Sequence, residues 1–394
     1  MHEARRFFFS RNKAVAWLRP MTWFVALVVS TEMGHSATLK DGAFHVYPGE
    51  NIQQALEAAA ASHEIKIVRV HAGIYRPETN RQALIWFNAR HDGIHLEAEG
   101  AVTLTAANPA IARPDDKSYP AIVNHLVYFG NGVSSNTVLR GFKITGANNF
   151  VSREHTRQIE RDTPPEVGLF FYTDGGAVKI YGHSYPTLDS LEIFDNYSSP
   201  CAGGVSIEHP RSEGTSTNLV WIRNCIFRNN RAQVTGAALD LLWGSSAAVE
   251  NCLFVENISN TGADFISLAV NEMPFTNNGV LTVFSGSRVV LRNCTFTKNR
   301  NAVDDMSRGS EYRNSIFWDN TLRQGLPGFR YELDVKDGDG VIGCRIQGER
   351  PDVKETISRE KNKMAGPPPD FQNDFSPRAP EFSGVGYRPI NRRP

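Results

Sequence analysis

The nine residues Ile222-Arg-Asn-Cys-Ile-Phe-Arg-Asn-Asn230 recur in recognisable form along the chain. Close copies begin at Val249, Leu291 and Tyr312, and the last of these has serine in place of cysteine. Degenerate copies begin at Leu139, Leu188 and Ile342. Self-similarity with a spacing of about 20 to 45 residues indicates one supersecondary unit per repeat, stacked as a solenoid.

Each unit alternates with a period of two residues. Cys225 and Phe227 face one way, and Asn224 and Ile226 face the other, which is typical of a β-strand. The cysteine position is occupied in successive units by Phe142, Leu191, Cys225, Cys252, Cys294, Ser315 and Cys344. The step from 252 to 294 corresponds either to two short coils or to one coil with a long loop.

The cysteines of these units are interpreted as an interior column, because a buried free cysteine behaves as a small hydrophobic residue. Coils about 4.8 Å apart leave a Cys225–Cys252 disulfide as an alternative. Cys201 lies outside the column, and the cysteine spacing lacks the paired C-x-x-C pattern of a metal site.

Five residues after the cysteine position, asparagine recurs. These residues are Asn196, Asn230, Asn257, Asn299 and Asn320. Asparagine tolerates a left-handed backbone, and in register its amides can form a hydrogen-bonded ladder. A second short strand follows each of these turns, introduced by small residues at 175–177, 203–204, 236–238 and 262–263, which let the backbones of adjacent coils approach closely.

The ends of the chain differ from its repeats. Residues 1–37 run from basic to apolar to small, as in a signal peptide cleaved between Gly34 and Ala37, and Met21 is an alternative start. Residues 50–61 predict an amphipathic helix that caps the first coil, with Ile52, Ala55, Leu56 and Ala59 on its buried face. Residues 349–394 are rich in proline and predict an irregular tail along the last coils.

Composition limits the partners. The chain has 394 residues, with 42 basic and 42 acidic side chains, so nothing favours nucleic acid or an anionic membrane surface. No segment after the signal peptide is apolar enough to span a membrane. We expect a secreted, periplasmic or cell-surface protein that is a monomer.

The predicted fold class is all-β: a single right-handed parallel β-helix over residues 38–348 with an N-terminal capping α-helix. The segments 46–56 and 70–75 resemble the N-terminal cap and first coil of pectin-lyase-like proteins. The Gly-Gly-Ala and Phe-x-x-Asn pairs are similar to repeats of polymorphic outer-membrane proteins. The resemblance covers about residues 44–346 and implies either a polysaccharide lyase or hydrolase, or an adhesin without catalysis.

The catalytic motifs of that family are not reproduced in order. Polygalacturonase-like hydrolases carry Asn-Thr-Asp, Asp-Asp, Gly-His-Gly and Arg-Ile-Lys, whereas this chain has only Thr173-Asp-Gly175, Gly182-His183 and Asp304-Asp305, at different spacings. A candidate site therefore has to be inferred from the side chains that the predicted strands place on one face.

The second strand of each unit supplies candidate rows. Val178, Ile180, Val205, Ile207, Leu239 and Leu241 are predicted to point inward. Their neighbours then point outward and align between coils. One row is Lys179, Ser206 and Asp240, with Asp304 as a possible continuation, and the next is Tyr181 and Glu208. His183, His209 and Trp243 lie near the strand ends.

These residues suit carbohydrate chemistry. Lys179, Glu208, Asp240 and His209 are the catalytic candidates, because paired carboxylates cleave glycosides and a lysine or histidine can abstract a proton in β-elimination. Tyr181, Trp243, His183 and Asp304 are candidates for substrate binding. No metal site or cofactor is predicted, although an acidic stripe could hold calcium. The segment Asp337-Gly-Asp-Gly340 is interpreted as a turn rather than a calcium loop.

Two hypotheses follow. In the first, an exported protein cleaves an acidic polysaccharide along these outward rows, beside the long loops at 150–171 and 269–288. In the second, a non-catalytic surface or matrix protein binds glycan or protein partners through the same face. The outward row can also be interpreted simply as a polar, solvated surface of a β-helix.

Overall fold

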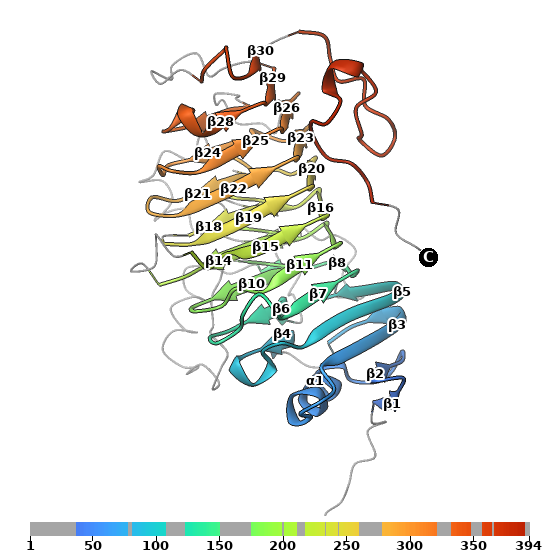
Figure 1. Ribbon diagram of the computed structural model, residues 1–394. Helices are drawn as coiled ribbons and strands as arrows, with labels where there is room; N and C mark the ends of the chain where they lie inside the picture. The colour runs from blue at the N-terminus through green and yellow to red at the C-terminus, as the bar shows by residue number, and fades with distance from the viewer. Residues whose placement is uncertain are drawn as a thin grey trace, which may run out of the picture. The chain divides into compact units, whose positions relative to one another are not determined.

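The computed structural model describes residues 37–77, 81–107, 123–149, 175–198, 201–210, 217–232, 234–242, 244–259, 278–320, 332–347, 357–364 and 366–390. The predicted signal peptide, the predicted loop 150–171, residues 269–277 of the second predicted loop, and Trp243 lie outside these residues. The prediction of a loop over 269–288 is wrong in its described part, because strand β21 (Leu281–Val283) lies within it. The described residues are predominantly parallel β-strands in stacked sheets, and the all-β prediction is confirmed at that level (Figure 1).

Three sheets contain the strands. The nineteen-stranded sheet consists of β1 (Thr38–Lys40), β2 (Ala43–Val46), β3 (Ile67–Tyr75), β5 (His95–Thr105), β7 (Val138–Arg140), β8 (Lys143–Thr145), β11 (Thr187–Asp189), β12 (Glu192–Phe194), β15 (Val220–Arg223), β16 (Ile226–Arg228), β19 (Ser246–Glu250), β20 (Leu253–Val255), β22 (Arg288–Arg292), β23 (Thr295–Thr297), β25 (Glu311–Arg313), β26 (Ile316–Trp318), β28 (Val341–Ile342), β29 (Arg345–Ile346) and β30 (Lys363–Met364).

The eight-stranded sheet consists of β4 (Arg81–Phe87), β6 (Val123–Phe129), β10 (Val178–Tyr181), β14 (Val205–Glu208), β18 (Leu239–Leu241), β21 (Leu281–Val283), β24 (Val303–Asp305) and β27 (Leu333–Val335). The three-stranded sheet consists of β9 (Asn148–Asn149), β13 (Tyr197–Ser198) and β17 (Arg231–Ala232). β1 and β2 pair antiparallel, and the other pairings between these strands are parallel.

One repeat passes through all three sheets. The chain runs along β15 and β16, crosses β17, follows β18, and returns at β19, which pairs parallel with β15. β16 likewise pairs with β20, and β20 pairs directly with β23, so the step from 252 to 294 is one coil with a long loop. This stacking of repeats is compatible with a parallel β-helix.

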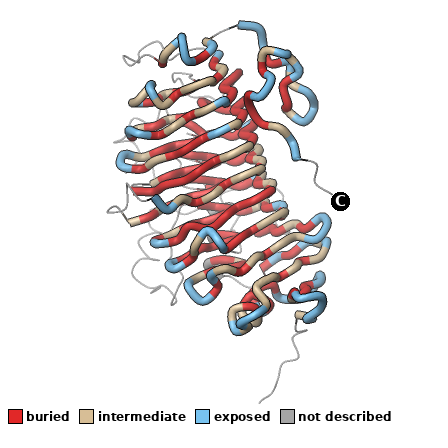
Figure 2. The backbone as a smooth tube through the Cα atoms, viewed as in Figure 1, coloured by how far each residue is buried: buried red, intermediate tan, exposed pale blue. Residues whose placement is uncertain are grey.

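Columns of like side chains fill the interior. Figure 2 shows that much of the backbone of the stacked strands belongs to buried residues. The rings of Phe227 and Phe254 stack with centroids 4.7 Å apart, and Phe254 and Phe296 stack at 4.1 Å. The predicted inward residues Val178, Ile180, Val205, Ile207, Leu239 and Leu241 are all buried in this core.

The cysteine column is confirmed. Cys225, Cys252, Cys294 and Cys344 are buried free thiols, so the alternative of a Cys225–Cys252 disulfide is wrong for this structure. The backbone N–H of Cys225 donates to Sγ of Cys252 at 3.4 Å. Burial raises the pKa of the Cys225 and Cys252 thiols well above the usual value, and that of Cys344 to about 12.

The asparagine ladder is also confirmed. The side-chain amide of each of the five asparagines lies one coil from the next, and Nδ2 of Asn230 donates to Oδ1 of Asn257 at 3.0 Å. The left-handed backbone, however, lies one residue earlier, at Asn229 (φ 49°) and its counterparts. The ladder asparagine is needed for its amide, and the preceding residue makes the turn.

Short elements complete the described chain. Helix α1 (Ile52–Ala61) is the single α-helix of the described segments, and it buries Ile52, Ala55, Leu56 and Ala59 as predicted. Asn51 caps it by accepting the N–H of Gln54. The 3-10 turns are η1 (Ala89–His91), η4 (Gly338–Gly340) and η5 (Pro380–Phe382). Within the described part of the chain, no helix is long and apolar enough to cross a membrane.

The C-terminal residues lie along the outer face of the nineteen-stranded sheet. Parallel pairing continues to β30, beyond the end predicted for the repeats. Residues 366–390 then contact β20, β23 and β26, where Phe382 packs on Ile316 and Trp318, and Tyr387 packs on Leu253 and Val255. The backbone of Arg388 forms two hydrogen bonds with the side chain of Asn251.

Candidate functional site

Parallel pairing aligns one outward residue from each strand of the eight-stranded sheet. In strand order these residues, here called the outer row, are Trp86, Tyr128, Lys179, Ser206, Asp240, Thr282, Asp304 and Asp334. The structure therefore brings together the predicted Lys179, Ser206 and Asp240, and it places Thr282 between Asp240 and Asp304. Tyr181 and Glu208 pair with each other, as predicted for the second row.

The outer face of the nineteen-stranded sheet offers a comparison. From β3 to β22 its charges alternate in sign, although Arg313 on β25 then lies opposite Arg292. Arg140 bonds both Glu97 at 3.0 Å and Asp189 at 3.1 Å. Further along, Arg223 pairs with Asp189, and Arg292 with Glu250. The opposite charges of that face largely neutralise one another, as is typical of a solvated surface with a structural role. The outer row instead contains one lysine and three aspartates.

Burial distinguishes the outer row further. Lys179, Ser206, Asp240 and Thr282 are each 0 % exposed, although they point away from the interior of the coils. Asp304 and Asp334 are only half-buried. Burying polar side chains on the outside of a sheet costs folding free energy unless each is compensated.

Lys179 forms a buried ion pair. Its Nζ donates to Oε2 of Glu208 at 2.9 Å and to Oγ of Ser206 at 3.1 Å. The Glu208 side chain remains 28 % exposed. Two predicted catalytic residues thus bond each other, with Glu208 at the accessible end of the pair.

Asp240 is held by its neighbours. Oγ1 of Thr235 donates to its Oδ2 at 2.9 Å. Gly236 makes room for it, since a β-carbon at that position would lie 2.6 Å from Cβ of Asp240. The glycine that was predicted to permit close approach of two coils also accommodates the carboxylate of the site.

Asp304 and Asp305 have different environments. Asp304 belongs to the outer row, whereas Asp305 points inward and accepts a hydrogen bond from Oη of Tyr312 at 2.8 Å. Burial raises the pKa of Asp305, despite the hydrogen bonds that lower it. The Asp-Asp sequence is therefore not a joint pair, and the partner of Asp304 across the strands is Asp334.

The remaining candidates lie beyond the strand ends. His183 is exposed, and its backbone N–H donates to Oδ1 of Asn131. His209 is buried, and its Nε2 donates to the carbonyl oxygen of Ser184 at 2.9 Å. Its ring lies 4.6 Å from that of Tyr185. His209 thus supports Tyr185 rather than joining the outer row.

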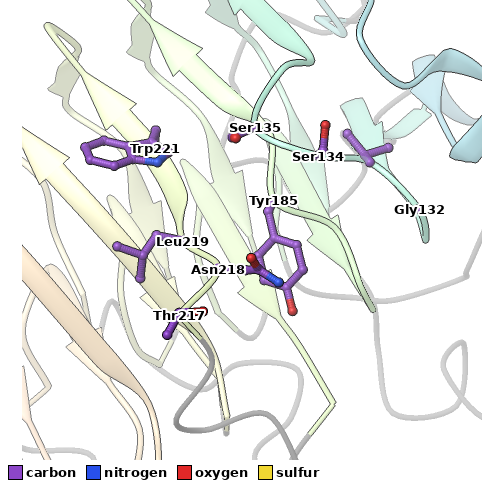
Figure 3. Close-up of a pocket in the computed structure, with 9 residues that line it drawn as sticks. Gly132, Ser134, Ser135, Tyr185, Thr217, Asn218, Leu219 and Trp221 are labelled. Carbon is purple, nitrogen blue, oxygen red and sulfur yellow. The ribbon is translucent and has the colours of Figure 1, made fainter.

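Tyr185 lines a hollow of about 280 Å³ between three successive turns, shown in Figure 3. The other lining residues are Gly132, Val133, Ser134, Ser135, Thr217, Asn218, Leu219 and Trp221. Sequence reasoning missed Tyr185 and Trp221. Trp221 occupies an outward strand position, a signal that could have been found, whereas Tyr185 lies in a turn whose position only the fold determines.

The suspected calcium loop is a turn, in agreement with the preferred interpretation. Asp337 caps η4 by accepting the N–H of Asp339 at 3.2 Å.

Comparison of the chain with protein-family models, with curated proteins and with solved structures finds no match in any of the three.

Proposed function

We propose that the stacked coils form a single right-handed parallel β-helix of the pectin-lyase-like type. The direct parallel pairing of each repeat with the next supports this, because parallel strands joined by a crossover connect with right-handed geometry in about 98% of cases. The basic, apolar and small residues of 1–37 support export through a cleaved signal peptide.

We further propose that the protein binds and cleaves a polysaccharide along the outer row. The observation that carries this proposal is a row of polar and charged side chains on the outside of one sheet, four of them fully buried. Their desolvation works against stability, and functional sites are where such a cost is commonly retained.

The accessible end of the row favours hydrolysis. Asp304 and Asp334 are half-buried on adjacent strands, whose backbones lie roughly 4.8 Å apart. That spacing is comparable to the separation of about 5 to 5.5 Å between the two carboxyl groups of retaining glycosidases. One carboxyl would protonate the glycosidic oxygen while the other attacks the anomeric carbon and forms a glycosyl-enzyme. Water, deprotonated by the first carboxylate, would then hydrolyse that intermediate and release a new reducing end. Lys179 is engaged by Glu208, which makes β-elimination by this lysine the less favoured route.

The aromatic end of the row supplies binding. Trp86 and Tyr128 precede Lys179 in the outer row, and Tyr181 packs with them beside Glu208. Tyr128 is itself buried, whereas Trp86 and Tyr181 are partly exposed and can stack on sugar rings. A polysaccharide lying along the stacked coils would therefore contact aromatic residues first and carboxylates further along.

The proposal is tested by incubating the untagged protein with a panel of neutral and acidic polysaccharides and measuring new reducing ends and unsaturated products. We expect reducing ends without unsaturation. Asp304→Asn and Asp334→Asn should each lower the rate by about 100-fold or more, since each removes an acid, base or nucleophile.

Glu250→Gln is the matched control, because it changes a half-exposed carboxylate on the other large sheet and should leave the rate unchanged. Glycan binding without cleavage, lost in Asp304→Asn, would replace the hydrolase proposal with the non-catalytic one. If the wild-type protein neither binds nor cleaves any member of the panel, both are rejected.

A further inference from the structure

A cluster of two histidines and one glutamate lies on the first coils, away from the outer row. His45 is on β2, His71 on β3 and Glu99 on β5, and these three strands pair in that order. One nitrogen or oxygen donor atom from each side chain lies within 4.8 Å of the other two. We propose that this cluster binds a divalent transition-metal ion such as Zn²⁺ or Cu²⁺.

The imidazoles already face each other. Nδ1 of His45 lies 2.8 Å from Nε2 of His71. Nε2 of His45 lies 3.2 Å from the carbonyl oxygen of Lys40, and it must carry a proton there because a carbonyl only accepts. With that proton on Nε2, Nδ1 of His45 is the nitrogen that faces His71 and can offer a lone pair to a metal ion. An outer hydrogen bond of this kind is the usual partner of a metal-binding histidine.

The second histidine is fixed on both sides. Tyr47 stacks on the ring of His71 at 4.1 Å with an interplanar angle of 2°. Oε2 of Glu99 lies 3.8 Å from Nδ1 of His71, and Glu99 is directly opposite His71 in the strand register. A metal ion placed between the two imidazoles would replace the shared proton, and the flexible Glu99 side chain would turn to complete the ligand set.

The donor set selects the ion. Two imidazoles and a carboxylate match a zinc site that keeps a fourth position for water, and imidazole equally suits Cu²⁺. Calcium and magnesium prefer ligand sets made of oxygen. With metal–nitrogen bonds of about 2.0 to 2.1 Å, a tetrahedral site needs its nitrogens about 3.3 Å apart, so the pair must open by roughly 0.5 Å.

The surrounding charges and burial permit this. Arg69 lies opposite His45 in the strand register, and Glu97 lies opposite Arg69. Because Glu97 balances the positive charge of Arg69, the negative charge of Glu99 remains available to a metal ion. His45 is 5 % exposed, the His71 side chain 21 % and the Glu99 side chain 54 %. The buried His45 is thus fixed within the protein, whereas the partly exposed His71 and Glu99 leave the donors accessible to an ion from solvent. Such an ion would tie together the three strands of the first coils.

The test uses the full-length untagged protein and titrates ZnCl₂, CuCl₂ or CaCl₂ by calorimetry. We expect one equivalent of Zn²⁺ or Cu²⁺ to bind and Ca²⁺ not to compete. Bound Cu²⁺ should show coupling to two nitrogen nuclei in its electron paramagnetic resonance spectrum. His71→Ala and Glu99→Gln should each weaken binding by about tenfold or more.

His95→Ala is the matched control among the 11 histidines of the chain. Nδ1 of His95 lies 3.8 Å from Oε1 of Glu97, the same separation as in the pair His71–Glu99. Binding should be unchanged in this variant. Equal affinity in wild type and His71→Ala, or an equal loss in His95→Ala, would overturn the proposal. Circular dichroism of each variant excludes misfolding, and no outcome depends on polysaccharide cleavage.

Discussion

Gly236 lies where the backbone is left-handed and where Asp240 needs the space that a β-carbon would occupy. Its φ is 56°, and an added Cβ would lie 2.9 Å from Cα of Asp240. Gly286 has a similar backbone, with φ of 79°, but nothing lies within 4 Å of an added Cβ. The two glycines therefore separate backbone strain from steric collision.

We predict that Gly286→Ala lowers the free energy of unfolding by about 1 kcal/mol, through backbone strain alone. Gly236→Ala should lower it by about 3 kcal/mol, because overpacking of the Asp240 strand is added to the same strain. Urea unfolding of both variants measures the difference. Equal losses would show that the turn from Gly236 to Asp240 can relax and that Asp240 is not tightly confined.

The ladder of hydrogen-bonded asparagines ends at the carboxyl group of Glu332. Nδ2 of Asn299 donates to Oδ1 of Asn320 at 2.8 Å, and both amide nitrogens of Asn320 donate to the carboxyl group of Glu332. Burial raises the pKa of Glu332 from 4.5 to about 7, although the hydrogen bonds from Asn320 lower it. An otherwise neutral ladder therefore contains one group that titrates near neutrality.

This pKa predicts how stability depends on pH. Between about pH 4.5 and pH 7 the folded state holds a proton that the unfolded state releases, so stability falls as the pH rises. The loss should approach about 3 kcal/mol above the folded pKa. Melting temperatures from pH 5 to pH 9 measure this. In Glu332→Gln the fall of melting temperature with rising pH that is assigned to this group should disappear, even if the variant is less stable at every pH. An unchanged pH dependence would refute the assignment.

At the scale of the whole molecule, each interior column draws its members from many coils. Cys225, Cys252 and Cys294 each lie immediately before a strand and are 27 and 42 residues apart in sequence, yet each sulfur donates to a backbone carbonyl of the preceding coil. A reagent reaches these thiols only when coils separate, whereas Cys201 is partly exposed.

We predict that a thiol-reactive dye labels no more than Cys201 rapidly in the native protein. The other four thiols should react together at the rate of unfolding, because burial removes access and, for Cys225, Cys252 and Cys344, also suppresses the thiolate form. Mass spectrometry of labelled peptides over time distinguishes the sites. Early labelling of Cys344 alone would instead show that the last coils open independently.

Much of this arrangement follows from the sequence, because a repeat of alternating residues fixes which side chains face inward. The interior cysteines, the ladder asparagines, the capping helix and the alignment of Lys179 with Ser206 and Asp240 all result from period and register. A one-residue shift of a strand would turn each of its side chains to the opposite face, so the apolar pattern of the strands permits only one alignment.

Tertiary structure decided the rest. The sequence does not reveal that Thr282 separates Asp240 from Asp304, because a long loop conceals which coil follows, nor that His209 supports Tyr185 beside a turn. It also does not reveal that His45, His71 and Glu99 converge, since their distance depends on the stacking of three strands. Local alternation determines which face of a strand each side chain occupies. The burial of that side chain and its hydrogen-bond partners depend on which coils lie next to each other, and this is determined only when the chain has folded.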